Sequence, residues 1–127
     1  MNNQQLVAVY GTLRAGEGNN GTLECAGSEY KGTCTLDNFV MHSLHGGFPG
    51  VFQGEGKVLV EVYSVDDLTP LDCLEGYDEN APKDGLYDRC TTPTPFGEAL
   101  IYTYNGERFG DVITDWCEWQ MNQAVNY

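Results

Sequence analysis

Short runs of strand-forming residues, separated by turns, fill most of the sequence and restrict the chain to a sheet-based fold. β-Branched and aromatic residues are concentrated in these runs, and glycine, asparagine, aspartate or proline interrupts them. Because no β-α-β alternation runs through them, we predict an α+β domain built around a mixed or antiparallel sheet, with closure into a barrel as one form of it. The predicted strands are residues 5–10, 29–36, 39–44, 57–65, 86–92 and 98–104.

Two further segments have helical spacing. The first covers about residues 67–75, where Asp66 or Asp67 can cap the start and Gly76 ends the helix. The second begins at about residue 110 or 111 and ends at about residue 123. Both helices are short and are expected to flank the sheet.

The segments between these elements are predicted as loops. Residues 11–22 contain four glycines and two asparagines, and residues 46–50 are expected to be irregular and exposed. The chain has 127 residues, 41% of them hydrophobic, which is enough for one packed core. Because the sequence contains no internal repeat or linker, we expect a single domain over residues 1–127.

The chain is strongly acidic, and this limits its partners. Nineteen Asp and Glu residues oppose six Lys and Arg residues, which gives a formal net charge of −13 at pH 7. The basic residues are dispersed, so no cluster can neutralise phosphates, and we expect neither nucleic acid nor an anionic membrane surface as a partner. A neutral or cationic small molecule fits this charge better.

The N-terminus and the cysteines predict a cytoplasmic protein. Residues 1–5 lack the basic and apolar regions of a signal peptide, and no apolar run is long enough to span a bilayer. The five cysteines are odd in number, and no pair has the Cys-x-x-Cys spacing. We therefore expect reduced thiols, the alternative being a disulfide framework.

A candidate binding loop begins at Tyr10 and Gly11, at the end of the first predicted strand. A strand that breaks at glycine can turn successive backbone N–H groups toward a ligand, and Thr12 adds a hydroxyl group. Such a nest suits a carboxylate or a carbonyl oxygen. The alternative is an ordinary turn between a strand and a loop.

Glu75 is the candidate acid/base residue. On the first predicted helix it shares a stripe with Leu68 and Leu71, at positions i, i+3 and i+7. If the leucines are buried, the carboxyl group lies on the same face, and burial raises the pKa of a carboxyl toward neutral pH. The alternative is that Glu75, in the last turn, points to water.

The remaining clusters do not favour a site. His42 and His45 have no third metal ligand nearby in the sequence, and the acidic residues between 66 and 88 lack the spacing of a calcium loop. Trp116 and Trp119 are expected to anchor the core. We therefore predict no metal site.

Taken together, these segments resemble the gamma-glutamylcyclotransferase-like family of small barrel domains. Residues 10–13 match the family's Tyr-Gly-Ser/Thr-Leu motif, and residues 71–77 resemble the helix end that carries its acidic catalytic residue. The likeness covers about residues 6–105 in the same order. The segments that carry it are VAVYGTLR at 7–14, GFPG at 47–50, GEG at 54–56, VEVYSVD at 60–66, LDCLEGY at 71–77, LYDR at 86–89 and ALIYTY at 99–104.

The resemblance implies a mixed β-barrel with short flanking helices and a gamma-glutamyl cyclotransferase activity. Such an enzyme converts a gamma-glutamylamine or gamma-glutamyl peptide to 5-oxoproline and a free amine, with Glu75 as the acid/base and no cofactor or metal. The acidic charge further predicts that a cationic leaving group is favoured over that of glutathione. The residues that the resemblance places around the substrate are Tyr10, Gly11, Thr12, Leu13, Tyr87 and Tyr104.

Two other functions stay open from the sequence. The same scaffold could sequester a small molecule without turnover, and residues 76–86, which depart from the family pattern, favour this alternative or a lid over the pocket. The acidic face or the tryptophan-bearing C-terminal segment could instead bind a protein partner. For that segment we expect either a role in covering an open sheet edge or a homodimer contact.

Overall fold

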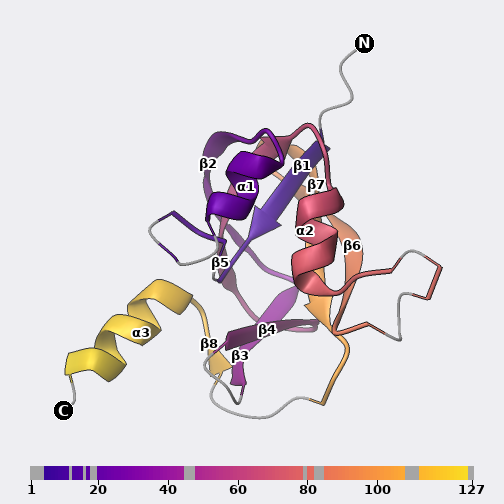
Figure 1. Ribbon diagram of the computed structural model, residues 1–127. Helices are drawn as coiled ribbons and strands as arrows, with labels where there is room; N and C mark the ends of the chain where they lie inside the picture. Colours follow the sequence, from indigo (N-terminus) through magenta and orange to yellow (C-terminus); the bar gives the residue numbers. More distant parts are fainter. Residues whose placement is uncertain are drawn as a thin grey trace.

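The computed structural model describes residues 5–11, 13–15, 17, 20–44, 48–78, 80–81, 85–107 and 112–125. Within these residues the chain forms eight strands and three helices (Figure 1). The strands make two sheets, and the helices lie outside them. The predicted α+β class is therefore confirmed.

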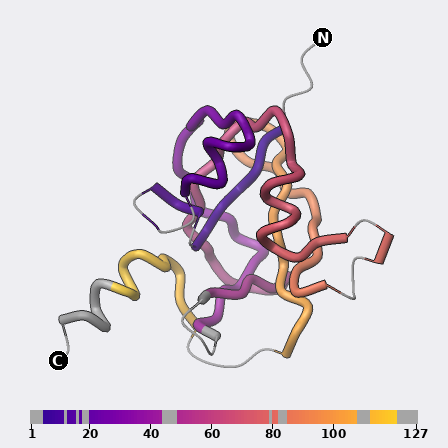
Figure 2. Tube along the Cα trace, in the orientation of Figure 1, coloured from indigo at the N-terminus to yellow at the C-terminus, as the bar shows by residue number. Residues whose placement is uncertain are grey.

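The larger sheet has five strands, with the first strand of the chain at its centre. β1 (Gln5–Val9) pairs antiparallel with β5 (Val58–Val65) and parallel with β7 (Gly97–Tyr104). β2 (Glu29–Leu36) extends the sheet beyond β5, and β6 (Tyr87–Thr94) extends it beyond β7. Figure 2 shows how β1 and β7, from opposite ends of the chain, lie side by side. The sheet is mixed, as predicted.

The smaller sheet is antiparallel and packs against one face of the larger sheet. It contains β4 (Phe48–Gln53), β3 (Phe39–Leu44) and β8 (Val112–Ile113), in that order. Among the described strands no continuous ladder joins the two sheets, and a single bridge between Asn38 and Gly56 lies at their junction. The apolar core between the sheets includes Met41, Val51, Val58, Val60, Val62 and Ile101.

Two short helices cover the other face of the larger sheet. α1 (Gly21–Cys25) and α2 (Thr69–Glu75) contact each other over this face (Figure 1). Their buried leucines, Leu23 and Leu71, join a second core, and full burial of a leucine contributes about 1.5–3 kcal/mol. The strand residues in this core include Val7, Val9, Tyr63 and Val65. This packing fixes the orientation of α2, whose last residue is Glu75.

The end of α2 agrees with the predicted signal, but its start does not. The helix begins at Thr69, two residues later than predicted, and its N-cap is Leu68, which makes no capping bond through its side chain. The backbone N–H of Thr69 donates to Asp67 Oδ1 at 3.0 Å, so Asp67 bonds the start of α2 from outside the N-cap position. Gly76 ends the helix in the left-handed conformation, with φ at 68°. A residue with a side chain is strained there, because few L-residues adopt a positive φ.

The expectation of an irregular, exposed segment at residues 46–50 is wrong for its described part. Residues 48–50 belong to β4, and Pro49 and Gly50 are buried. Proline removes a backbone donor, but β4 is an edge strand, where one side of the backbone needs no ladder partner. Residues 46 and 47 lie outside the described residues.

Two other expectations are corrected. Residues 21–22, predicted as loop, belong to α1, which is held in place because Leu23 is buried. The C-terminal helix α3 (Trp116–Val125) begins later than predicted, because Val112 and Ile113 pair with β3 as β8. β-Branched residues suit such a pairing better than a helix.

Candidate active site

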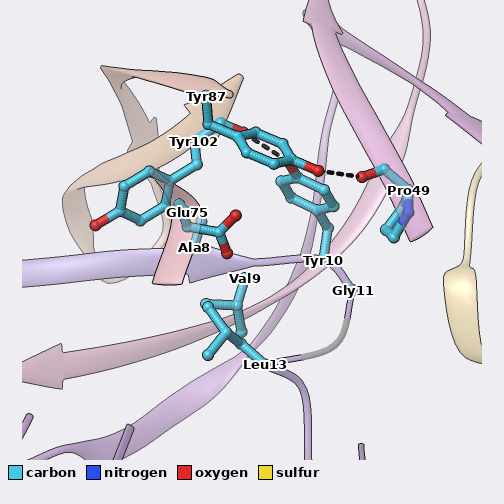
Figure 3. Close-up of a pocket in the computed structure, with 9 residues that line it drawn as sticks. All are labelled: Ala8, Val9, Tyr10, Gly11, Leu13, Pro49, Glu75, Tyr87 and Tyr102. Carbon is cyan, nitrogen blue, oxygen red and sulfur yellow. Dashed lines mark hydrogen bonds between the residues drawn. The ribbon is translucent and has the colours of Figure 1, made fainter. Parts of the chain in front are cut away.

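A pocket lies at one edge of the larger sheet. The C-terminal ends of the parallel strands β1 and β7 reach this edge together, and β6 starts there because it runs antiparallel to β7. The loop after β1, the end of α2 and part of β4 complete the pocket, whose volume is about 370 Å³ including the space open at its mouth. The residues that line it are Ala8, Val9, Tyr10, Gly11, Leu13, Pro49, Glu75, Tyr87 and Tyr102 (Figure 3).

Glu75 places its carboxyl group in this pocket among apolar and aromatic side chains (Figure 3). Leu71, one turn earlier on α2, is fully buried and turns this face of the helix toward the sheet. Desolvation raises the pKa of Glu75 to about 7. The described lining contains no Lys, Arg or His that would lower this pKa again. A carboxyl with such a pKa can both accept and donate a proton at neutral pH.

Two tyrosine hydroxyl groups in the pocket donate their protons to backbone carbonyls. Tyr10 donates to the carbonyl oxygen of Tyr102 at 2.7 Å, and Tyr87 donates to that of Pro49 at 2.8 Å (Figure 3). Burial raises the pKa of both hydroxyls well above the ordinary tyrosine value, and the nearby Glu75 carboxylate adds to the shift. Both tyrosines therefore stay neutral, and their oxygens keep lone pairs that can accept a hydrogen bond from a ligand.

The loop after β1 approaches β4 closely, and glycine makes this approach possible. A Cβ atom at Gly11 would lie 2.5 Å from Cγ of Pro49. The backbone N–H of Arg14 donates to the carbonyl oxygen of Gly11 at 3.0 Å, which closes a turn, and Leu13 within it is buried. Thr12, the other predicted residue of this loop, lies outside the described residues.

Tyr104 does not reach the described lining. Its ring packs against that of Tyr87, with the centroids 5.4 Å apart, so it contacts a residue of the pocket lining. Tyr102, two residues earlier on the same face of β7, lines the pocket instead. The structure thus brings together the predicted residues Tyr10, Gly11, Leu13, Glu75 and Tyr87, and adds Ala8, Val9, Pro49 and Tyr102, which the sequence reasoning missed.

A second carboxylate supports the pocket wall from outside. The hydroxyl group of Tyr102 donates to Asp72 Oδ1 at 2.6 Å. Nη1 of Arg89 donates to both oxygens of Asp72 at 2.8 Å. Because Asp72 lies on α2 and its two partners lie on β7 and β6, these bonds tie the helix to the sheet beside the pocket.

Other sequence features can now be placed. All five cysteines are free thiols. No group of three His, Cys, Asp or Glu residues that could hold a metal ion occurs in the described parts of the chain, and His45 lies outside them. No described helix has the length and apolar character needed to cross a membrane.

Comparison with known sequences identifies the family. The chain matches the family "Gamma-glutamyl cyclotransferase, AIG2-like" over residues 7–121, which extends the likeness beyond the expected residues 6–105. A Vibrio cholerae protein provisionally named a gamma-glutamylcyclotransferase is 40% identical over 121 residues, covering 91% of this chain and 97% of the relative. The gamma-glutamylcyclotransferase family protein YtfP of Escherichia coli K12 is 36% identical over 98 residues, which cover 77% of this chain and 80% of the relative. The chain therefore belongs to the gamma-glutamyl cyclotransferase, AIG2-like family.

Solved structures share the fold. The solution NMR structure of Escherichia coli YtfP has a TM-score of 0.65 at 31% identity, with 88% of this chain and 94% of that chain covered. The crystal structure of an uncharacterised Pyrococcus horikoshii protein has a TM-score of 0.76 at 24% identity, with 97% and 98% covered. The second likeness bears on the fold alone.

Proposed function

We propose that this protein is an enzyme that converts a gamma-glutamylamine or gamma-glutamyl peptide to 5-oxoproline and a free amine. The observation that carries the proposal is the Glu75 carboxyl, which has a pKa of about 7 in a pocket formed with the loop after β1. Membership of the gamma-glutamyl cyclotransferase, AIG2-like family supports the reaction class. The pocket supplies the proton-transfer group that this reaction needs.

The substrate brings its own nucleophile. The α-nitrogen of the glutamyl group attacks the γ-carbonyl carbon, so that a new C–N bond closes a five-membered lactam and the C–N bond to the leaving nitrogen breaks. Because the attack is intramolecular, holding the group folded can supply roughly 7–11 kcal/mol of the barrier. Glu75 takes protons from the attacking nitrogen and delivers them to the leaving nitrogen, a role worth roughly 10²–10⁴-fold in rate.

The rest of the pocket orients the glutamyl group. The oxygens of Tyr10 and Tyr87 have their protons committed to backbone carbonyls, so each can accept a hydrogen bond from the α-ammonium group. We assign the developing oxyanion to backbone N–H groups of the turn at Gly11 and Leu13, which lines the same pocket. In this arrangement the nucleophile, the base and the oxyanion donors surround one carbonyl carbon.

Release of 5-oxoproline tests the proposal. The substrates are a gamma-glutamyl polyamine, a gamma-glutamyl alkylamine and glutathione, and the proteins are the native chain, Glu75→Gln and Glu24→Gln. Glu24 lies exposed on α1, so its substitution controls for the loss of one carboxylate from a helix. We expect release by the native chain and by Glu24→Gln, and none above background by Glu75→Gln.

Two results would count against the proposal. Release by folded Glu75→Gln at the native rate would remove Glu75 from the mechanism. No release from any substrate by the folded native chain would favour the alternative of binding without turnover. Mass spectrometry of the denatured native protein would then show whether a small molecule is retained through purification.

A further inference from the structure

A buried cation, Arg14, lies in the pocket loop itself, immediately after the lining residue Leu13. The guanidinium group of Arg14 donates from Nε to Glu61 Oε2 at 2.9 Å and from Nη1 to Asp115 Oδ1 at 2.8 Å. The residue is only 8% exposed. Burial disfavours its charged form, but the hydrogen bonds to Asp115 and Glu61 outweigh this effect and raise the pKa of Arg14 above its ordinary value. Arg14 is therefore a charged group held from two sides.

Glu61 connects this cation to the backbone of the loop. Its Oε1 accepts a hydrogen bond from the backbone N–H of Ala15 at 2.8 Å and another from the hydroxyl group of Tyr63 at 2.8 Å. Glu61 lies on β5, which is paired on both sides, by β1 and by β2. Two hydrogen bonds to Glu61, from the Arg14 side chain and from the Ala15 backbone, thus attach the turn that presents Gly11 to the inner strand β5.

The C-terminal segment supplies the third part of the network. Asp115 lies immediately before α3, and Trp116, the first residue of α3, is fully buried. The Trp116 side chain donates from Nε1 to Glu17 Oε1 at 3.2 Å. The segment between β1 and α1 therefore contacts the start of α3 at two points, although the described pocket lining contains no residue of α3.

We infer that Arg14, Glu61 and Asp115 are positioning residues that clamp the pocket loop to β5 and to the start of α3, so that the C-terminal helix keeps the loop in the conformation that binds the glutamyl group. The effect on substrate rests on the proposed function. The clamp itself is a property of the chain that can be measured without substrate.

The physical basis is preorganisation. A loop that samples other conformations binds its ligand more weakly in proportion to the population that is competent to bind. Once substrate is bound, the competent conformation is restored, and the chemical step proceeds as before. Loss of the clamp is therefore expected to raise KM more than it lowers kcat.

Asp115 is the residue at which to test the clamp, because it is the most exposed of the three, and its removal does not leave a carboxylate buried. Asp115→Ala removes the contact to Arg14. It also removes the bond from the Glu118 backbone N–H to Asp115 Oδ1, which caps α3 at 3.2 Å. Asp115→Asn keeps an acceptor for that cap and removes only the charge. Glu118→Ala is the matched control, since it deletes an exposed carboxylate from the same helical turn.

Two measurements are made on the full chain: hydrogen exchange of the amides between residues 10 and 17, without ligand, and KM and kcat for 5-oxoproline release. For Asp115→Ala we expect faster exchange in this loop and a rise in KM of about two- to fivefold, because Arg14 loses one of its two ion-pair partners and keeps Glu61. Asp115→Asn should show a smaller change in the same direction. Glu118→Ala and the pH profile of kcat should match the native chain.

The outcomes separate the clamp from the proposed function. Loop exchange in Asp115→Ala equal to that in Glu118→Ala would overturn the clamp, whatever the activity. Because Asn keeps an acceptor at Oδ1 for both Arg14 and the Glu118 N–H, native behaviour of Asp115→Asn would overturn the role of the Arg14–Asp115 charge pair in the clamp. Faster exchange with an unchanged KM would overturn the link to substrate. If the native chain releases no 5-oxoproline, the exchange measurement alone decides the clamp, and only the proposed function fails.

Discussion

Asp72 and Glu75 lie three residues apart on α2 and have opposite surroundings. Asp72 accepts hydrogen bonds from Arg89 at 2.8 Å and from Tyr102 at 2.6 Å, so its charge is matched. Among the described residues Glu75 has no hydrogen-bond donor, and its carboxyl group lies in the pocket. One carboxylate therefore fixes the helix to the sheet, and the other is left to change its protonation state.

The first prediction concerns the pH dependence of activity. Because the pKa of Glu75 is raised to about 7, kcat/KM should rise with pH through a midpoint near 7 as the base ionises. Burial raises the pKa of Tyr10 and Tyr87, so neither should produce a loss of activity at mildly basic pH. Initial rates of 5-oxoproline release between about pH 5 and 9 measure this profile. A midpoint near the ordinary glutamate value of 4.5 would contradict the assignment.

The second prediction concerns stability. A carboxyl whose pKa is 4.5 when unfolded and about 7 when folded binds more protons in the folded state, so the folded protein loses stability as the pH rises from 4.5 to 7. Glu75→Gln stays neutral and avoids this loss. We expect the variant to exceed the native chain in free energy of unfolding by on the order of 1–3 kcal/mol above pH 7, and by little near pH 4.

Urea unfolding of both proteins at the two pH values measures the difference. Glu24→Gln, on the exposed side of α1, is the control and should show no such pH-dependent gain. An advantage of Glu75→Gln that is the same at both pH values would show that the carboxyl is not desolvated in the folded protein.

Much of the fold could be predicted because its signals are local. β2 and β3 begin and end at the predicted residues. Their signals are local because the residue types of each strand and the turn at Asp37 and Asn38 between them are neighbours in the sequence. β8 could not be predicted in this way. It has two residues, and it exists because Val112 and Ile113 meet His42 and Met41 of a strand far away in the sequence.

The pocket residues, too, fall into those with a local signal in the sequence and those that depend on distant parts of the chain. The position of the Glu75 carboxyl in the pocket follows from its place one turn after the buried Leu71 on the same helix face. The sequence carries no local signal for Pro49, because it enters the site through residues far away in the chain: its ring lies beside Gly11, and its carbonyl oxygen accepts a hydrogen bond from Tyr87, 38 residues later. Tyr102 and Tyr104 share one face of β7, so alternation could not decide which of the two reaches the pocket.

The third prediction tests the close approach of the loop to β4. Gly11→Ala would place a Cβ atom 2.5 Å from Cγ of Pro49, so the loop or Pro49, both of which line the pocket, must shift. Gly21→Ala is the control, because no atom lies within 4 Å of its added Cβ and alanine favours the helix that Gly21 begins. We expect kcat/KM to fall by roughly tenfold or more for Gly11→Ala. We expect no change of activity for Gly21→Ala, and equal activity of the two folded variants would show that the loop does not position substrate.

The last prediction concerns the leaving group. The chain has a net charge of −13, and the described pocket lining contains Glu75 but no basic residue to attract an anion. Long-range attraction should therefore favour a gamma-glutamyl polyamine over a neutral gamma-glutamyl alkylamine, and both over glutathione, in kcat/KM. Because salt screens exposed charges, the preference should shrink as ionic strength rises from about 0.01 to 0.5 M. The three substrates share the glutamyl end, so differences among them report on the leaving group alone. A higher kcat/KM for glutathione at low salt would contradict electrostatic selection and would point to specific contacts with its peptide portion.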